Sequence, residues 1–498
     1  MKFIKKITSW QVVLFVQLAV SVFLAGITFK LNVLPTKYEA VMVAILVLLL
    51  IAMFFFTRDG KKGKHAKTSI RPIIGKIVSL LLSIVMFVGS GMLAKTDGAI
   101  EAITSNHTQT TVYAVYALKS NNYKDSDDLK NKAIGVNTSK LSDKCKKALK
   151  ALKEEISVKQ KNYDSYKSST DDLYSGKIKG LFADEAYESV MDTLHPDWQD
   201  KVEVVWEYQI KETVEDTSTN AKVTKEPFTL LISGVDSRGD VSEKSRSDVD
   251  MILTIDPIHH RVLMTNIPRD YFVTIYGQGG KDKLTHSGLY GTACVEKTIE
   301  NLLDIDIDYN ARIGFQAVTK IIDAIGGIDI YSDKAFNTYT DSRIHIKKGM
   351  QHMDGETALA YARERHAYTT GDRHRAANEQ QVAETILAKV MKPSILSHYT
   401  DLLDAIEGTF QTNLKSSDIT SLAKMQLDKG GKWTVKKSIL YGESKKATGG
   451  LLMPNQELYY NFPSKKSIAD NRKYIKDMLA GKDVQIAETD SSPTSHMD

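Results

Sequence analysis

Phe228-Thr-Leu-Leu-Ile-Ser-Gly-Val-Asp236 is a strand-like run of apolar residues that ends in a glycine and an acid. Two more strand-like runs follow at residues 251–255 and 261–267. Ser245-Arg246-Ser247-Asp248 precedes the first of these, and Pro268-Arg269-Asp270 directly follows the second. Ligands of an open α/β sheet bind at strand ends and in the adjoining loops. The pattern therefore predicts an α/β domain with a charged ligand site.

More arginines follow in Tyr361-Ala-Arg363-Glu-Arg365-His366 and in Gly371-Asp372-Arg373-His374-Arg375. If the first segment is extended, Arg363 and Arg365 project from one side of it, because side chains alternate with a period of two. Guanidinium groups match the oxygens of a diphosphate with paired donors and stay charged at any working pH. The arginines therefore indicate a phosphate-rich ligand.

Asp236 and Asp248 supply hard oxygen ligands of the kind that Mg²⁺ prefers. Arginines and a carboxylate-bound Mg²⁺ together would neutralise the charge that develops when a phosphate ester bond breaks. The sequence has no P-loop, no GxSxG elbow and no HExxH motif. The prediction of chemistry on a phosphate ester therefore depends on the arginines and carboxylates and not on one of these short motifs.

Three apolar stretches, at residues 10–27, 40–56 and 73–94, have about the length that a helix needs to cross a bilayer. Basic residues precede the first stretch and fill the loop between the second and third, which predicts a cytoplasmic N-terminus and loop. Residues 1–97 are therefore predicted to form three transmembrane helices, with everything after about residue 95 outside the cell.

The remaining chain divides by composition. Residues 98–211 alternate strand-like and helix-like runs and predict a small α/β accessory domain. A polar linker at residues 212–226 leads to the larger α/β domain, residues 227–481, and residues 482–498 are predicted to be a disordered tail. The net charge of +5 is nearly balanced, which argues against a nucleic-acid partner, and the two cysteines indicate neither a disulfide framework nor a zinc site.

The sequence resembles the LytR–CpsA–Psr family, and the three spans plus an accessory domain resemble its capsule branch. The motifs that carry the resemblance are Gly234-Val-Asp236, Arg246-Ser-Asp248, Ile267-Pro-Arg269-Asp270, Lys281-Asp-Lys-Leu-Thr-His286, Ala324-Ile-Gly-Gly-Ile-Asp329, Met353-Asp-Gly-Glu-Thr-Ala-Leu-Ala-Tyr361, Arg363-Glu-Arg365 and Gly371-Asp372 with Arg375. The resemblance implies an α/β/α sandwich that holds a polyisoprenyl diphosphate, with the lipid tail in an apolar pocket.

The resemblance also implies a reaction, in which a lipid-diphosphate-linked capsular polysaccharide is transferred to peptidoglycan and polyprenyl phosphate is released. The implied partners are the lipid-linked polysaccharide, peptidoglycan, membrane lipid and other membrane proteins of capsule synthesis. The cofactor is Mg²⁺, with Mn²⁺ as an alternative. The implied sites are Asp236 and Asp248 for the metal, Arg246 and Asp248 for catalysis, and Arg269, Arg363, Arg365, Asp372, Arg375 and Gln380 for the substrate.

One position departs from the family pattern. The family usually has Gln four residues after the arginine at position 375, where this chain has Glu379, followed by Gln380 and Gln381. Because a carboxylate facing a diphosphate would repel it, we expect Glu379 to point away and Gln380 to take its role.

Two alternatives to the transferase remain. The same residues would serve a polyprenyl diphosphate phosphatase, in which water replaces the acceptor hydroxyl. A membrane-bound regulator of capsule synthesis would instead use the basic cytoplasmic loop and the accessory domain.

Overall fold

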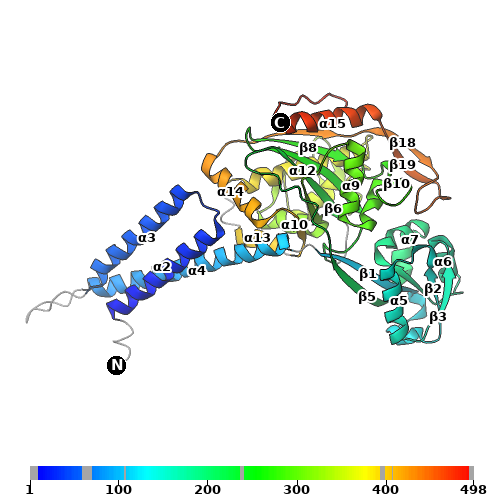
Figure 1. Cartoon of the computed structure of the whole chain (residues 1–498), viewed down its shortest axis with the longest axis horizontal. Coiled ribbons are helices and arrows are strands. Elements are labelled where there is room, and N and C mark those ends of the chain that lie inside the picture. Colours follow the sequence, from blue (N-terminus) through cyan, green and yellow to red (C-terminus); the bar gives the residue numbers. More distant parts are fainter. Residues whose placement is uncertain are drawn as a thin grey trace, which may run out of the picture.

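The computed structural model describes residues 9–58, 70–105, 108–235, 240–392, 399–406 and 408–492. It consists of a bundle of three long helices, a small α/β domain and a larger α/β domain (Figure 1). The predicted ligand Asp236, most of the basic loop and the first basic residues of the chain lie outside the described residues.

The bundle helices are α2 (Trp10–Leu31), α3 (Thr36–Thr57) and α4 (Arg71–Ser105). Each is long and apolar enough to span a membrane, which confirms the three predicted spans. The buried Ser79 hydroxyl donates to Gln17 Oε1 at 2.5 Å and joins α4 to α2. Helix α4 continues well beyond residue 94, where the sequence predicted its end, and the chain enters the accessory domain a few residues later.

The accessory domain contains a five-stranded sheet in the order β3-β2-β4-β1-β5. Strand β2 is parallel to β3 and β4, whereas β1 is antiparallel to β4 and β5. The strands are β1 (Thr108–Leu118), β2 (Ala133–Asn137), β3 (Lys159–Tyr163), β4 (Gly180–Asp184) and β5 (Val202–Thr213). The helices are α5 (Asp143–Glu155), α6 (Tyr166–Tyr174), α7 (Glu188–Leu194) and α8 (Trp198–Lys201).

The larger domain contains a six-stranded sheet in the order β16-β11-β6-β7-β8-β17. Its central strands β6, β7 and β8 are antiparallel, while β11 and β17 run parallel to β6 and β8 respectively. The strands are β6 (Phe228–Val235), β7 (Ser247–Asp256), β8 (Arg261–Ile267), β11 (Tyr309–Gly314), β16 (Phe410–Thr412) and β17 (Thr434–Ile439).

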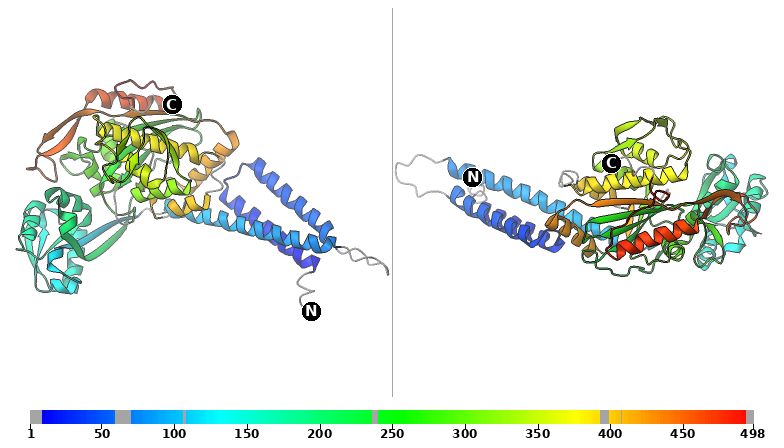
Figure 2. Two further views of the ribbon diagram at one scale, coloured as in Figure 1. Left: turned by 180° about the vertical axis from the view of Figure 1, so that it is seen from behind. Right: turned by 90° about the horizontal axis from the view of Figure 1, so that it is seen from above.

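Helices cover both faces of this sheet, which confirms the predicted fold class (Figure 2). On one face, Leu231, Ile252 and Leu263 are fully buried in a core shared with α9 (Thr292–Leu303) and α15 (Lys465–Leu479). On the other face, Met251, Val262 and Met264 pack against α12 (Asp372–Val390). The right-hand view of Figure 2 shows α12 in yellow and α15 in red on opposite sides of the sheet.

The remaining elements surround this sandwich. They are the helices α10 (Phe315–Ala324), α11 (Gly355–Ala362), α13 (Tyr399–Ile406) and α14 (Ser416–Lys429), the strands β9 (Phe272–Thr274), β10 (Lys281–Lys283), β12 (Ile328–Ser332), β13 (Phe336–Asn337), β14 (His345–Ile346), β15 (Gly349–Met353), β18 (Gly442–Ala447) and β19 (Leu458–Pro463), and the short turns η1 (Lys119–Asn121), η2 (Ser126–Leu129), η3 (Thr138–Lys140), η4 (Glu185–Tyr187) and η5 (Leu284–Tyr290).

Helices α13 and α14 place the larger domain against one end of the helix bundle (Figure 1). Lys95 of α4 pairs with Asp404 of α13. Lys37, at the start of α3, pairs with Asp428 of α14 at 2.7 Å, and Lys424 Nζ donates to Asn32 Oδ1 at 2.7 Å.

The prediction of a disordered tail from residue 482 onward is wrong for residues 482–492. The Asp490 side chain is fully buried and accepts hydrogen bonds from Ser467, Asn471 and Tyr474 of α15. Polar residues without periodicity can be ordered when other elements supply hydrogen-bond partners, which local sequence does not reveal. Residues 493–498 lie outside the described residues.

Candidate anion-binding site

The site begins at an irregularity in the pairing of β6 with β7. Gly234 lies opposite Val249, and Val235 lies opposite Ser247, so Asp248 is an extra residue in a β-bulge. A bulge interrupts the regular alternation of side chains and can redirect one of them. The carboxylate predicted from the sequence therefore belongs to a locally reshaped strand at the end of the sheet.

The Asp248 carboxylate is surrounded by donors. Arg269 Nη1 and Thr285 Oγ1 donate to its Oδ1 at 3.1 and 2.9 Å, and Arg246 Nη2 lies 3.7 Å from Oδ2. Burial alone would raise the pKa of this carboxyl, but the charges of Arg246, Arg269 and Arg375 and the Thr285 hydroxyl hold it well below its ordinary value. Asp248 is therefore ionised across the physiological pH range.

Helix α12 brings a further arginine to this carboxylate. Arg375, in the first turn of α12, donates from Nη2 to the Asp248 backbone carbonyl at 2.6 Å and from Nε to Glu379 Oε1 at 3.0 Å. Asn266, at the end of β8, donates to Glu379 Oε2 at 3.1 Å. The positive end of the helix dipole adds to the guanidinium charge at this point.

These groups share one cavity, whose polar lining is partly unsatisfied. Asp250 Oδ2, Asn266 Oδ1, Arg269 Nε and Asp372 Oδ1 are buried without a hydrogen-bond partner among the described residues. Buried polar atoms are normally paired, so both donors and acceptors here remain available to a polar ligand. The lining residues are Asp248, Val249, Asp250, Asn266, Ile267, Pro268, Arg269, Asp270, Asp372, Arg375, Ala376, Glu379 and Asn461.

Three of the carboxyls that line the cavity, those of Asp248, Asp250 and Glu379, have shifted pKa values. Burial raises the pKa of Asp250 to about 8, with the negative charges of Asp248 and Glu379 adding to the effect and the Ser247 hydroxyl opposing it. Burial also raises the pKa of Glu379, against the opposing charge of Arg375. An ionised Asp248 therefore lies beside a carboxylic acid at Asp250 that can donate a hydrogen bond at neutral pH.

The structure brings together most of the site residues predicted from the sequence. Asp248, Arg269, Asp372 and Arg375 line the same cavity. Arg246 approaches Asp248 from outside the cavity lining, and Arg365 Nη1 lies 3.8 Å from Asp372 Oδ1 at its edge.

Arg363 is placed differently from the expectation for an extended segment. The preceding residues form α11, and Arg363 caps its C-terminal end in a helical conformation, with its guanidinium 4.7 Å above the Phe315 ring. The alternation that would have aligned Arg363 with Arg365 therefore does not apply. Arg363 does not line the cavity around Asp248.

The structure places Gln380 and Glu379 differently from the expectation that Glu379 points away and Gln380 takes its place. Gln380 is fully buried, and its Nε2 donates to the backbone carbonyls of Met264 and Ser438 at 3.1 and 2.8 Å. Glu379 lines the cavity instead, because ion pairing with Arg375 and the Asn266 amide compensates its charge.

Sequence reasoning missed Asp250, Asn266, Thr285 and Asn461. A carboxyl inside the apolar strand around Asp250 was a usable signal, because a buried acid needs a reason to be there. Asn461 gave no comparable signal, since tertiary packing alone brings it to this cavity.

An apolar surface lies beside the charged cavity. Leu230, Ile232, Leu253 and Ile255 are only half-buried on the sheet face that α12 covers. Two α14 residues, Ile419 and Leu422, pack near Leu230 and Ile255. Helix α14 also contacts the end of the helix bundle, so it connects the part of this face at Leu230 and Ile255 to the bundle.

Fold and site together define a membrane-anchored α/β/α protein with an arginine-lined anion site. The sequence profile described as the LytR_cpsA_psr family matches residues 199–476. This chain belongs to that family, as the sequence motifs predicted.

Two curated relatives carry the name polyisoprenyl-teichoic acid–peptidoglycan teichoic acid transferase TagU. The protein of Bacillus cereus (strain AH820) is 32% identical over 251 residues, which cover 50% of this chain and 78% of the relative. That of Bacillus subtilis (strain 168) is 31% identical over 257 residues, covering 51% and 79%. Among solved structures, protein gbs0355 from Streptococcus agalactiae matches with 25% identity and a TM-score of 0.46, covering 56% of this chain and 97% of that one.

Proposed function

We propose that this chain transfers a glycopolymer from a polyisoprenyl diphosphate carrier to peptidoglycan, and that the glycopolymer is a capsular polysaccharide. The observation that carries the proposal is the cage of Arg246, Arg269 and Arg375 around Asp248, next to a half-covered apolar face. A lipid diphosphate has the same two parts, a dense anion and an apolar chain. The curated relatives, named as transferases of a polyisoprenyl-linked polymer to peptidoglycan, support this reaction class.

In the proposed reaction, a peptidoglycan hydroxyl attacks the phosphorus that bears the glycan. A new phosphodiester bond forms, the bond between that phosphorus and the bridging oxygen breaks, and polyprenyl phosphate leaves with the net proton. Arg269 and Arg375 hold the diphosphate, with Arg365 reaching it beside Asp372, and Arg246 offsets the charge that develops at the reacting phosphoryl group.

Mg²⁺, or Mn²⁺ in its place, would neutralise diphosphate charge when bound. Asp248 fits as an oxygen ligand, because it is ionised and Arg246 Nη2 lies 3.7 Å from its Oδ2, beyond hydrogen-bond distance. Among the described residues no group of three potential ligands gathers, and the second proposed ligand, Asp236, lies outside them. Phosphate oxygens and water would complete the coordination.

The proposed topology has a cytoplasmic N-terminus and the two α/β domains outside the cell. The contacts of α13 and α14 with the bundle would then hold the site near the outer membrane surface, where both a lipid carrier and peptidoglycan are accessible. We expect the apolar sheet face to receive the lipid chain.

The test uses the full chain in lipid vesicles with Mg²⁺, a polyisoprenyl diphosphate-linked capsular glycan and peptidoglycan. We expect Arg269→Ala to lower the transfer rate by roughly 100-fold or more, the effect of removing one charge-stabilising group. Arg343→Ala is the matched control, because Arg343 is exposed and pairs only locally with Asp341 among described residues. Both variants are checked for an unchanged melting temperature.

The products separate the alternatives. Glycan linked to peptidoglycan in the wild type supports the transferase. A diphosphatase would release glycan phosphate at the same rate with and without peptidoglycan, and no glycan would become linked to peptidoglycan. Normal attachment in Arg269→Ala cells together with altered capsule transcription would show a regulator.

A further inference from the structure

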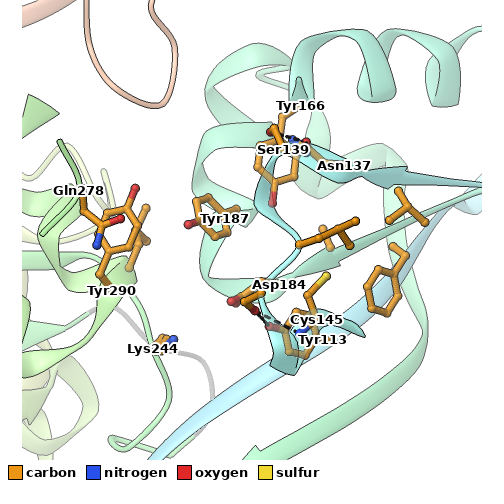
Figure 3. A pocket seen from close by; sticks show the side chains of 16 residues that line it. Tyr113, Asn137, Ser139, Cys145, Tyr166, Asp184, Tyr187, Lys244, Gln278 and Tyr290 are labelled. Atoms are coloured by element: carbon orange, nitrogen blue, oxygen red, sulfur yellow. Dashed lines mark hydrogen bonds between the residues drawn. The ribbon is translucent and has the colours of Figure 1, made fainter. Parts of the chain in front are cut away.

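A second cavity lies between the accessory domain and the larger domain (Figure 3). Its volume is about 400 Å³, at the lower end of the range for pockets that hold small molecules. Tyr187 and Asp184 of the accessory domain face Lys244, Gln278 and Tyr290 of the larger domain across it. The cavity is therefore built by both domains and is distinct from the arginine-lined site.

The accessory domain presents the ends of two parallel strands to this cavity. Asn137 ends β2 and Asp184 ends β4, and both residues line it. Ser142, which caps the N-terminus of α5, lines it too. The carboxyl ends of parallel strands, next to a helix N-terminus, are where α/β folds bind ligands.

Two opposite charges face the cavity without meeting. Asp184 accepts a hydrogen bond from the Ala186 backbone N–H at 3.0 Å, and it forms no ion pair with a described residue. Lys244 likewise has no ion-pair partner in the described part of the chain. Burial raises the pKa of Asp184 to about 6 and lowers that of Lys244, and the charge of each group partly offsets this effect on the other.

Aromatic side chains form part of the cavity wall. Tyr113, Tyr166, Tyr187 and Tyr290 line the cavity together with Phe182. Aromatic walls bury apolar groups and accept cations on their faces. A ligand that fits must therefore be compact, carry both charges and tolerate an apolar surround.

We propose that this cavity binds a small zwitterion of the α-amino-acid class, with its ammonium group at Asp184 and its carboxylate at Lys244. The ammonium contacts Asp184 and the tyrosine faces, while the carboxylate meets Lys244 across the cavity. A neutral sugar would offer neither charge an ionic partner.

The experiment measures binding, so its outcome is independent of the proposed transferase reaction. The full chain in detergent is titrated calorimetrically with each of the standard L-amino acids and with D-alanine, D-glutamine and D-glutamate. Each amino acid that binds is then replaced by its N-acetyl and its amide form. We expect at least one free amino acid to bind and both blocked forms to bind at least roughly tenfold more weakly, the loss typical of one charge-assisted hydrogen bond.

Variants locate the binding. Asp184→Asn and Lys244→Met should each weaken it roughly tenfold or more. Lys150→Met and Glu154→Gln are the controls, because both residues are exposed on α5 and pair with each other. Thermal melts without ligand show whether the variants remain folded. Absence of binding by every amino acid, or equal affinity in Asp184→Asn and Lys244→Met, would overturn the proposal.

Discussion

Glu379 adds a further carboxyl to the cavity that Arg269 and Arg375 line. Its carboxylate pairs with Arg375 and accepts from Asn266, so it competes with a ligand for the same arginine. Burial raises the pKa of the Glu379 carboxyl. The carboxyl is neutral when the pH is below this raised pKa and negatively charged when the pH is above it. Its charge should consequently make diphosphate binding depend on pH.

We predict that Glu379→Gln strengthens diphosphate binding on the alkaline side. As pH rises, the wild-type carboxyl ionises and repels the ligand, whereas glutamine stays neutral. At pH 8.5 the variant should bind farnesyl diphosphate roughly tenfold more tightly, about 1.4 kcal/mol, and this difference should shrink as the pH is lowered from 8.5 towards 5.5. Calorimetric titration across this range measures the effect.

Glu384→Gln is the control for that experiment. Glu384 lies on the same helix and pairs with Lys437 at 2.8 Å, outside the cavity lining. Its affinity curve should follow the wild type. Parallel curves for wild type and Glu379→Gln would show that the carboxyl at position 379 does not oppose the ligand.

The residues of the arginine-lined site were predictable where they adjoin strand ends. Asp248 and Arg269 flank apolar runs, and this position alone indicated a site. The role of residues 379 and 380 was not predictable, because adjacent helix positions point in different directions and only the packing of α12 decides which one faces the sheet. Asp250 was not predicted either, since its raised pKa depends on the surrounding burial.

At the scale of elements, the local sequence pattern predicted the strands. It did not predict that a segment can be ordered by hydrogen bonds to residues far away in the sequence. The strand-like run at residues 261–267 coincides with β8, because a short buried run with β-branched residues is a property of the segment itself. The ordered segment at residues 482–492 instead depends on α15 and on Arg373, which donates to the carbonyls of Thr489 and Ser491. Nothing within that segment encodes these partners.

We predict that Asp490→Ala destabilises the larger domain. The substitution leaves the Ser467 hydroxyl, the Asn471 amide and the Tyr474 hydroxyl without their buried acceptor. Each unsatisfied buried group costs about 1–3 kcal/mol, and relaxation will reduce the sum to roughly 2–4 kcal/mol. The unfolding midpoint of the full chain in denaturant measures the loss.

The exposed neighbour Glu488 supplies the control Glu488→Ala, and equal midpoints for the two variants would contradict a structural role for this segment.

At the scale of the whole molecule, the accessory domain is hydrogen-bonded directly to the segment that carries Arg246. The backbone N–H of Thr110 in β1 donates to the Ser242 carbonyl at 2.9 Å, and the Lys244 N–H donates to the Thr110 carbonyl at 3.0 Å. The hydroxyls of Thr110 and Ser242 lie 2.9 Å apart. Lys244 thus touches the interdomain cavity and precedes Arg246 by two residues, which joins the two sites through one short stretch of backbone.

We predict that breaking this link slows the proposed transfer reaction without abolishing substrate binding. Thr110→Pro removes the N–H that donates to the Ser242 carbonyl. Both backbone groups of Thr110 bond to residues 242–244, and proline is tolerated in a strand at a position whose N–H does not bond to a neighbouring strand. With its anchor loosened, the segment should hold Arg246 less firmly beside Asp248, so the transfer rate should fall roughly tenfold. The affinity for the lipid diphosphate should change little, because Arg269 follows β8 and Arg375 lies in α12, and Thr110 contacts neither element.

Thr110→Val, which keeps the N–H and loses only the hydroxyl, is the matched comparison. If both variants melt like the wild type and transfer glycan at equal rates, then Arg246 is positioned by the larger domain alone and the accessory domain has no part in it.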